Sequence, residues 1–217
     1  MPRQLALPLD LSPSFAEADF IPDAANVAAR EFLAAPESWP DHRLVLFGPA
    51  GSGKTHLAHV TAARHGWRLD QGAALRGLPH LPARGWVLED ADLCPEPAAL
   101  FHALNAAREA RLPLLLTGQA PPSRWPFTLP DLMSRLRATT AVGLEAPSDT
   151  LLAAMLAKHL ADRQLNLAPA LQQLLLLHLP RDTASLRSAV ARLDEAALAS
   201  GRLNRATVME ALRELDT

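Results

Sequence analysis

The fold of this chain is decided by the stretch Gly48-Pro49-Ala50-Gly51-Ser52-Gly53-Lys54-Thr55, which fits the pattern G-x-x-x-x-G-K-[ST]. The residues before it, 43–47, are apolar enough for a buried strand, and residues 56–60 after it open a helix. This is the context that a phosphate-binding loop requires. The sequence therefore predicts a strand, a phosphate-binding loop and a helix in direct succession.

Each part of the loop has a chemical role. The glycines let successive backbone N–H groups point at phosphate oxygens, and the helix N-terminus adds its positive end. Lys54 is expected to reach the outer phosphates, and the Thr55 hydroxyl to hold Mg²⁺. We therefore expect residues 48–55 to bind ADP or ATP with Mg²⁺. The alternative is a glycine-rich turn that carries a surface lysine.

Composition bounds the class of protein. With 217 residues and 49% hydrophobic content, the chain can form one large domain or two small ones around a sizeable core. A net charge of −2 argues against binding that is driven by contacts to DNA phosphates. The single cysteine, Cys94, excludes an internal disulfide framework and is expected to be a small apolar filler. We find no signal peptide or membrane-spanning run, and expect a cytoplasmic protein.

The order of elements indicates an α/β fold. Residues 1–19 are expected to form an extended tail, and residues 20–147 a nucleotide-binding core in which strands and helices alternate. Because each strand is apolar throughout, we expect a parallel sheet covered by helices on both faces. The expected strands are 44–47, 67–69, 87–90, 112–117 and 139–144, and the expected helices are 26–33, 55–64 and 97–110.

Residues 148–217 have a different character, because they contain only helical patterns. Ser148 or Asp149 is expected to cap the first helix, Asp182 or Thr183 a later one, and Asn204 the last. We expect these residues to form a small all-α lid domain.

Two adjacent acids, Glu89 and Asp90, end the strand expected at 87–90. A nucleoside triphosphatase needs one acid there to hold the Mg²⁺ shell and another to polarise the attacking water. We assign Glu89 to the metal together with Thr55, and Glu89 and Asp90 to catalysis. Asp92 could substitute for one of them. In the alternative interpretation all three acids simply cap the following helix.

Three stretches resemble the AAA+ core of the DnaA family, the bacterial replication initiators. They are Leu46-Phe-Gly-Pro-Ala-Gly-Ser-Gly-Lys-Thr-His-Leu-Ala-His59, Leu116-Thr-Gly-Gln-Ala-Pro-Pro122 and Leu129-Pro-Asp-Leu-Met-Ser-Arg-Leu136. The similarity runs from about residue 20 to the C-terminus. It implies an AAA+ P-loop sheet between helices, followed by a helical lid.

The chain is also similar to one subgroup of that family. It is expected to end after the lid, without a helix-turn-helix domain, and it begins with Gln4-Leu5-Ala6-Leu7-Pro8-Leu9, which is similar to a sliding-clamp-binding peptide. The resemblance implies that Gln4, Leu5, Leu7, Pro8 and Leu9 dock on the clamp, the beta subunit of DNA polymerase III. Contact with DNA would then be mainly indirect, through the clamp. The sequence does not decide whether the chain forms homo-oligomers. The alternative for the N-terminal peptide is a tail that folds back on its own core.

By motif position, the resemblance implies that Arg135 is an arginine presented in trans to ATP bound by DnaA, whose hydrolysis switches the initiator off. A guanidinium supplied in this way stabilises the transition state and raises the rate of hydrolysis by a factor of about 10³ to 10⁵. Two alternatives stay open. Arg135 could be a surface residue that pairs with Asp131, and Arg137 is the competing candidate.

Some residues depart from the family pattern. Gln119 stands where the family often has Asp, Glu89 replaces the more usual Asp, and Ala184 occupies the position of a lid arginine, with Arg181 and Arg187 off register. We therefore expect slow or absent intrinsic hydrolysis. The alternative function is a self-sufficient AAA+ ATPase, such as a helicase loader or remodelling factor. A small-molecule P-loop kinase fits less well, because the lid follows the core instead of being inserted in it.

Overall fold

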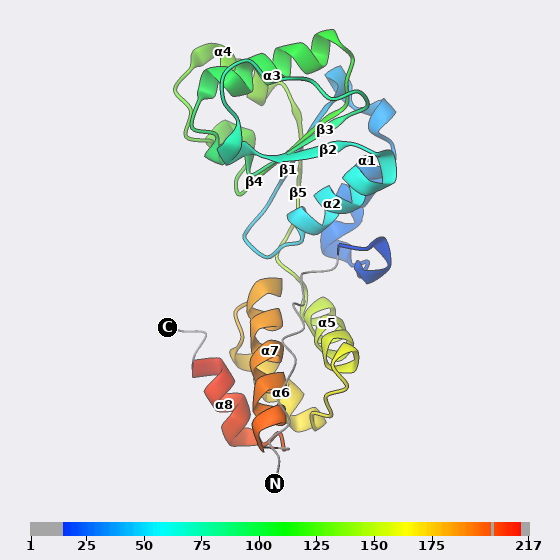
Figure 1. Cartoon of the computed structure of the whole chain (residues 1–217), viewed down its shortest axis with the longest axis vertical. Helices are drawn as coiled ribbons and strands as arrows, with labels where there is room; N and C mark the ends of the chain where they lie inside the picture. Colours follow the sequence, from blue (N-terminus) through cyan, green and yellow to red (C-terminus); the bar gives the residue numbers. More distant parts are fainter. Residues whose placement is uncertain (1–14, 201, 214–217) are drawn as a thin grey trace. The chain divides into compact units, whose positions relative to one another are not determined.

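The computed structural model describes residues 15–200 and 202–213. They belong to two compact units, one from Phe15 to Ala146 and one that begins at Pro147 (Figure 1). The predicted clamp-binding residues Gln4, Leu5, Leu7, Pro8 and Leu9 lie outside the described part of the chain. Each unit has its own hydrophobic core.

The first unit is built on a five-stranded sheet with the order β2-β3-β4-β1-β5, in which every pair of neighbours is parallel. The predicted parallel sheet is confirmed. Its strands are β1 (Arg43–Phe47), β2 (Arg68–Gln71), β3 (Trp86–Glu89), β4 (Leu114–Gly118) and β5 (Thr140–Gly143).

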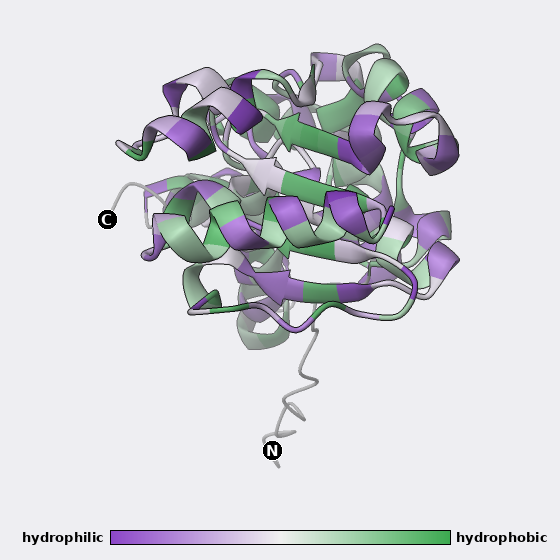
Figure 2. Cartoon of the chain, turned by 90° about the horizontal axis from the view of Figure 1, so that it is seen from above, coloured by the Kyte–Doolittle hydropathy of each residue, from purple (hydrophilic) through white to green (hydrophobic). Residues whose placement is uncertain are grey.

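Helices cover both faces of this sheet (Figure 1). Alternate residues of a strand point to opposite faces, so that Leu44 and Leu46 pack with one pair of helices while Val45 packs with the other pair. Figure 2 shows the strands as mostly hydrophobic and the helices as mixed. The helices on the first face are α1 (Val27–Ala34) and α2 (Lys54–His65), and those on the second are α3 (Pro97–Glu109) and α4 (Pro130–Arg137).

Most elements lie within one or two residues of the sequence prediction, and the shifted start of β4 has a clear physical reason. Strand β4 begins at Leu114 instead of residue 112, because Pro113 has no N–H for pairing and contributes only its carbonyl, which accepts from Trp86 N (2.9 Å). The N–H of Leu112 instead bonds to Ala107 O (2.8 Å) and closes the end of α3.

The residues just before α1 also differ from the prediction of a tail up to residue 19. Glu17–Asp19 form a 3-10 helix, η1, and the segment around it packs on α2. The Phe15 ring stacks on His59 with 4.0 Å between centroids, and Glu17 forms an ion pair with Arg64. Aromatic and charged contacts therefore attach residues 15–19 to the core, although their sequence has no clear periodicity.

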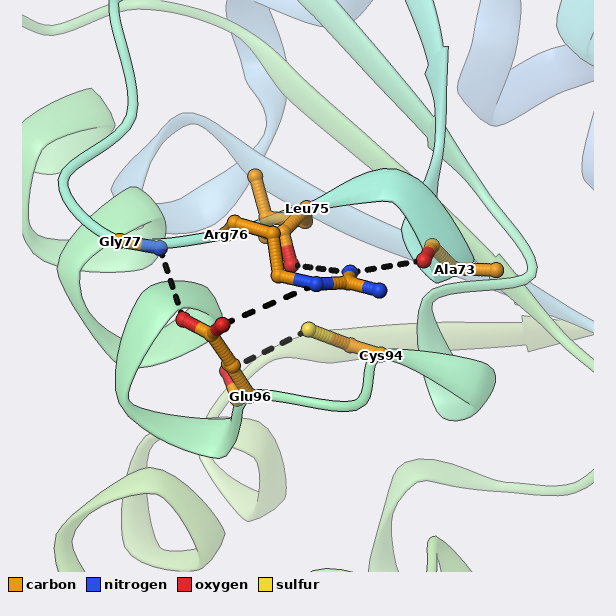
Figure 3. Close-up of polar contacts among 6 residues, drawn as sticks. All are labelled: Ala73, Leu75, Arg76, Gly77, Cys94 and Glu96. Carbon is orange, nitrogen blue, oxygen red and sulfur yellow. Dashed lines mark hydrogen bonds and ion pairs between the residues drawn. The ribbon is translucent and has the colours of Figure 1, made fainter.

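Polar contacts join the segment between β2 and β3 to the segment that follows β3 (Figure 3). The Glu96 carboxylate accepts from Gly77 N at 2.8 Å and lies 3.7 Å from Arg76 Nε. The Cys94 thiol donates to Glu96 O at 3.4 Å. Burial raises the pKa of Cys94, which agrees with the predicted filler role for this thiol.

The second unit contains the helices α5 (Asp149–Asp162), α6 (Pro169–His178), α7 (Thr183–Ser200) and α8 (Arg205–Arg213) within the described residues. Leucines from all four helices form one buried cluster. The predicted caps are present, since Ser148 Oγ accepts from Leu151 N, Asp182 Oδ1 from Ser185 N and Asn204 Oδ1 from Ala206 N. No helix in the described part of the chain is long and apolar enough to cross a membrane.

The core of the helical unit can be tested with two leucines of α6. Leu175 is fully buried, whereas Leu177 is 79% exposed. Leu175→Ala should lower the free energy of unfolding by about 2–5 kcal/mol, because it leaves a cavity in a packed core. Leu177→Ala should change it by less than about 0.5 kcal/mol. Urea denaturation followed by circular dichroism measures both, and equal effects would contradict the packing described here.

Candidate functional site

The predicted loop connects β1 to α2 at the carboxyl edge of the sheet. Gly48 is required by a close approach, because a Cβ at this position would lie 2.4 Å from the backbone oxygen of Leu144. Gly53 has a φ of 99°, which favours glycine. The loop is thus shaped by its glycines, as the motif predicts.

Lys54 is the first residue of α2, and its ammonium group lies over the loop. Its Nζ donates to the carbonyls of Gly48 (2.8 Å) and Pro49 (2.9 Å), and the side chain is buried. Burial lowers the pKa of Lys54, while three nearby carboxylates oppose this shift, in the order Asp90, Asp92 and Glu89. The structure therefore places the loop lysine and the predicted acids in one site.

Glu89 ends β3 and is buried. Its Oε2 accepts from Gln71 Nε2 at 3.0 Å and lies 3.5 Å from His59 Nε2. His59 lies on α2 and brings a second polar side chain to this carboxylate. Gln71 was not singled out, although a polar residue at the end of β2 meets the same sheet edge as Glu89 because the strands are parallel.

Asp90 and Asp92 are held by backbone contacts between the ends of β3 and β4. Asp90 has a left-handed backbone, with φ 47°, and its N–H donates to Thr117 Oγ1 at 2.9 Å. Asp92 Oδ2 accepts from the N–H of Gln119 at 2.9 Å. Asp90 precedes the 3-10 helix Ala91–Leu93 without a side-chain cap bond. This disfavours the interpretation in which the acids only cap the following helix.

The oxygen donors here fit a magnesium ion that arrives with phosphates. Thr55 is exposed on the first turn of α2, and Asp92 Oδ1 and Ser52 Oγ are buried without a hydrogen-bond partner among the described residues. The described residues contain no cluster of three or more metal-ligating side chains. Mg²⁺ is commonly bound through one or two carboxylates and the substrate phosphates, without a dedicated protein cage. The assignment of Thr55 and Glu89 as Mg²⁺ ligands therefore remains a prediction.

Arg135 and Arg137 are on α4, away from this cluster. The Arg135 guanidinium lies over the Phe101 ring, 5.4 Å from its centroid. Together with Arg108, it lowers the pKa of Arg43, whose burial is the main cause of that shift. Arg43 begins β1, whereas the loop follows the end of β1. Arg135 thus lies at the edge of the sheet opposite the loop.

Arg137 has different surroundings. It is exposed and lines a surface hollow of about 590 Å³ together with Trp125, Phe127 and Met133. Neither arginine forms an ion pair within the described residues. The pairing of Arg135 with Asp131, which the sequence left as an alternative, is therefore not formed among them. In the helical unit Ala184 is exposed, and Arg181 pairs with Asp149 at 2.9 Å.

Comparison with solved structures defines the fold. Domain III of DnaA from Thermotoga maritima superposes with a TM-score of 0.77 at 15% identity, over 94% of this chain and 97% of that one. AMPPCP-bound DnaA from Aquifex aeolicus gives 0.72 at 18% identity, over 93% and 71%. The RuvB branch migration motor of T. maritima gives 0.66 at 19% identity, over 89% and 70%. No family model and no curated protein sequence matches the chain. The protein has a DnaA-like AAA+ fold.

The link between β3 and β4 gives a test of the site's framework. Thr117→Val keeps the shape of the side chain but leaves the Asp90 N–H without its acceptor, so it should cost about 1–3 kcal/mol of stability. Thr117→Ser keeps the hydroxyl and should cost about 0.8 kcal/mol for the lost methyl group. Thermal and urea denaturation provide the comparison. A valine variant as stable as wild type would show that the bond is unimportant.

Proposed function

We propose that this chain is a nucleotide-binding AAA+ regulator of replication initiation, similar to Hda, the DnaA homologue of regulatory inactivation. It docks on the sliding clamp and stimulates ATP hydrolysis by DnaA. One observation carries the proposal: Lys54 and three carboxylates share the loop's edge of the sheet, while Arg135 lies at the opposite edge. The first group can hold this chain's own nucleotide, and the second is available to another molecule.

Nucleotide binding follows from the chemistry of the loop. Phosphate oxygens would replace the carbonyls of Gly48 and Pro49 as partners of Lys54, and they fit a buried cation better because they carry charge. Thr55 and Glu89 would hold Mg²⁺, which neutralises phosphate charge when bound. DnaA structures with the same fold contain AMPPCP, which supports ADP or ATP as the ligand here.

Intrinsic hydrolysis is proposed to be slow. Glu89 is already engaged by Gln71 and His59, so binding a metal would require it to exchange these partners. Gln119 is exposed at the sensor position, and the lid position holds Ala184. A nucleotide that remains bound as a structural ligand fits these residues better than rapid turnover does.

The trans-acting role of Arg135 is supported by geometry. Strand β1 spans five residues, and each residue adds about 3.3 Å, so an arginine beside its start is far from phosphates beyond its end. Arg135 therefore cannot serve its own loop in this conformation. Its guanidinium, which forms no ion pair with the residues that the structure describes, can instead bond two phosphate oxygens of a neighbouring molecule.

Clamp docking is proposed from the sequence of residues 4–9. Leu5, Leu7 and Leu9 can fill apolar pockets, Gln4 can make a directed hydrogen bond, and Pro8 reduces the entropy lost on binding.

A self-sufficient AAA+ ATPase is the second candidate function. It is favoured by the likeness to RuvB, which is described as a branch migration motor. Turnover by the purified chain separates the two functions. Rates of about 1 to 10³ per second without partners would favour the second.

Nucleotide binding is tested by removing the loop lysine. Lys54→Ala should abolish ADP and ATP binding in calorimetry, because it removes the charge that faces the phosphates. The matched control is Lys158→Ala, which changes the only other lysine of the sequence, on α5. Unchanged ADP affinity in folded Lys54→Ala protein would show that the nucleotide site is elsewhere.

The regulatory function is tested by measuring ATP hydrolysis by DnaA in the presence of clamp loaded on DNA. Arg135→Ala should remove the stimulation while nucleotide affinity and clamp binding stay unchanged. Arg135→Lys should rescue poorly, because lysine keeps the charge but loses the planar fork.

Two further variants test whether clamp docking is required and whether Arg137 is the trans-acting residue. A triple alanine variant of Gln4, Leu5 and Leu7 should lose clamp binding and stimulation together without a change in thermal stability. Arg137→Ala should stimulate normally. If only Arg137→Ala fails, the trans-acting arginine is Arg137, and if both arginine variants stimulate normally, the proposed mechanism is wrong.

A further inference from the structure

Arg135 is half-buried, lies over an aromatic ring and forms no ion pair within the described residues. Phe101, on α3, is half-buried and packs against the core cluster that includes Leu132 and Leu136 of α4. Its ring therefore has a fixed position beneath the Arg135 guanidinium. A cation within about 6 Å of a ring centroid is attracted to the ring face.

Arg43, on which Arg135 acts electrostatically, pairs with Asp41, and this carboxylate is already occupied. One of its oxygens accepts from Arg43 Nη2 at 2.7 Å, and the other lies 3.7 Å from Arg108 Nε. The cluster thus holds three guanidinium groups, counting Arg135, and one carboxylate. Like-charge repulsion between Arg43 and Arg135 disfavours movement of Arg135 towards Asp41, and within the described residues Arg135 has no ion pair.

We propose that Phe101 is the positioning residue for Arg135. The ring attracts the guanidinium through its face, so the N–H donors stay available for an anion, whereas a carboxylate partner would occupy them and would have to be displaced. The like charge on Arg43 disfavours pairing of Arg135 with Asp41. The partner that this arrangement fits is a phosphate group, two oxygens of which accept parallel N–H bonds.

The same reasoning distinguishes Arg135 from Arg137. Arg137 is exposed, and the described residues place no aromatic ring over its guanidinium. A free side chain must be ordered when it binds, whereas a preorganised one loses less entropy. The role of Phe101 in stimulation rests on the proposed function of Arg135, but the stacking itself does not.

The stacking is tested in the full-length protein by NMR of arginine side chains. The Nε–Hε signal of Arg135 is assigned by its loss in Arg135→Lys. In wild type it should show a ring-current shift, which Phe101→Leu removes and Phe101→Tyr retains. An Arg135 signal that does not move in Phe101→Leu would overturn the proposed position of the ring.

The consequence for function is tested by the DnaA hydrolysis assay with loaded clamp. Phe101→Leu should lower the stimulated rate by about two- to fivefold, with nucleotide and clamp binding unchanged, and Phe101→Tyr and Phe101→Trp should restore it. The control is Phe32→Leu, the same change at a partly exposed position of α1 on the other face of the sheet.

The outcomes separate this inference from the proposed function. Normal stimulation by Phe101→Leu, when Arg135→Ala has none, would refute the positioning role and leave the trans-acting arginine intact. Normal stimulation by Arg135→Ala would refute the proposed function, and the NMR measurement would still decide whether the ring holds the arginine. If Phe101→Leu is unfolded by circular dichroism, equal loss of stimulation in the folded Tyr and Trp variants would also refute the role.

Discussion

The position of β4 between β1 and β3 is the constraint on which the site depends. Phe47 aligns with Gly118 and Leu88 with Leu116, so the strand that carries the loop and the strand that carries the acids are two spacings apart. Two spacings of about 4.8 Å give a gap of about 10 Å. Lys54 lies on the loop side of this gap, and its pKa responds to all three acids. The arrangement is set by backbone pairing before any ligand binds.

The sheet also separates two kinds of charge. Its carboxyl edge gathers Lys54 with Glu89 and its neighbouring acids, whereas its amino edge gathers Arg43, Arg108 and Arg135 around one carboxylate. A parallel sheet makes this possible because all strands begin at one edge and end at the other. Under the proposed function, the first edge retains a nucleotide and the second is presented to a partner. The two tasks can then be changed independently by mutation.

The sequence predicts features that depend on local pattern. Apolar runs predict β1, β3 and β4, and the specific spacing predicts the loop; Pro113 shifts the start of β4. Strand β2, Arg68–Gln71, is mostly polar and only partly buried, so that apolarity does not define it. Contacts between distant residues were not predictable. Gln71 and Glu89 are 18 positions apart and meet only because β2 pairs with β3. Phe101 and Arg135 meet only because α3 packs against α4. The attachment of Phe15 to His59 was missed because residues 15–19 have no periodicity.

The contacts of Glu89 connect these observations to the rate of hydrolysis. A buried carboxylate needs partners, and here they come from β2, on the side of β3 opposite β4, and from α2, which covers a face of the sheet. Nucleotide binding requires Lys54 to exchange the carbonyls of Gly48 and Pro49 for phosphate oxygens. Coordination of a metal at the loop would in addition require Glu89 to give up Gln71 and His59, so metal-dependent hydrolysis carries a further exchange cost. The loop can therefore retain a ligand without an efficient catalytic acid. This is the combination that suits a chain whose arginine acts on the nucleotide of another molecule.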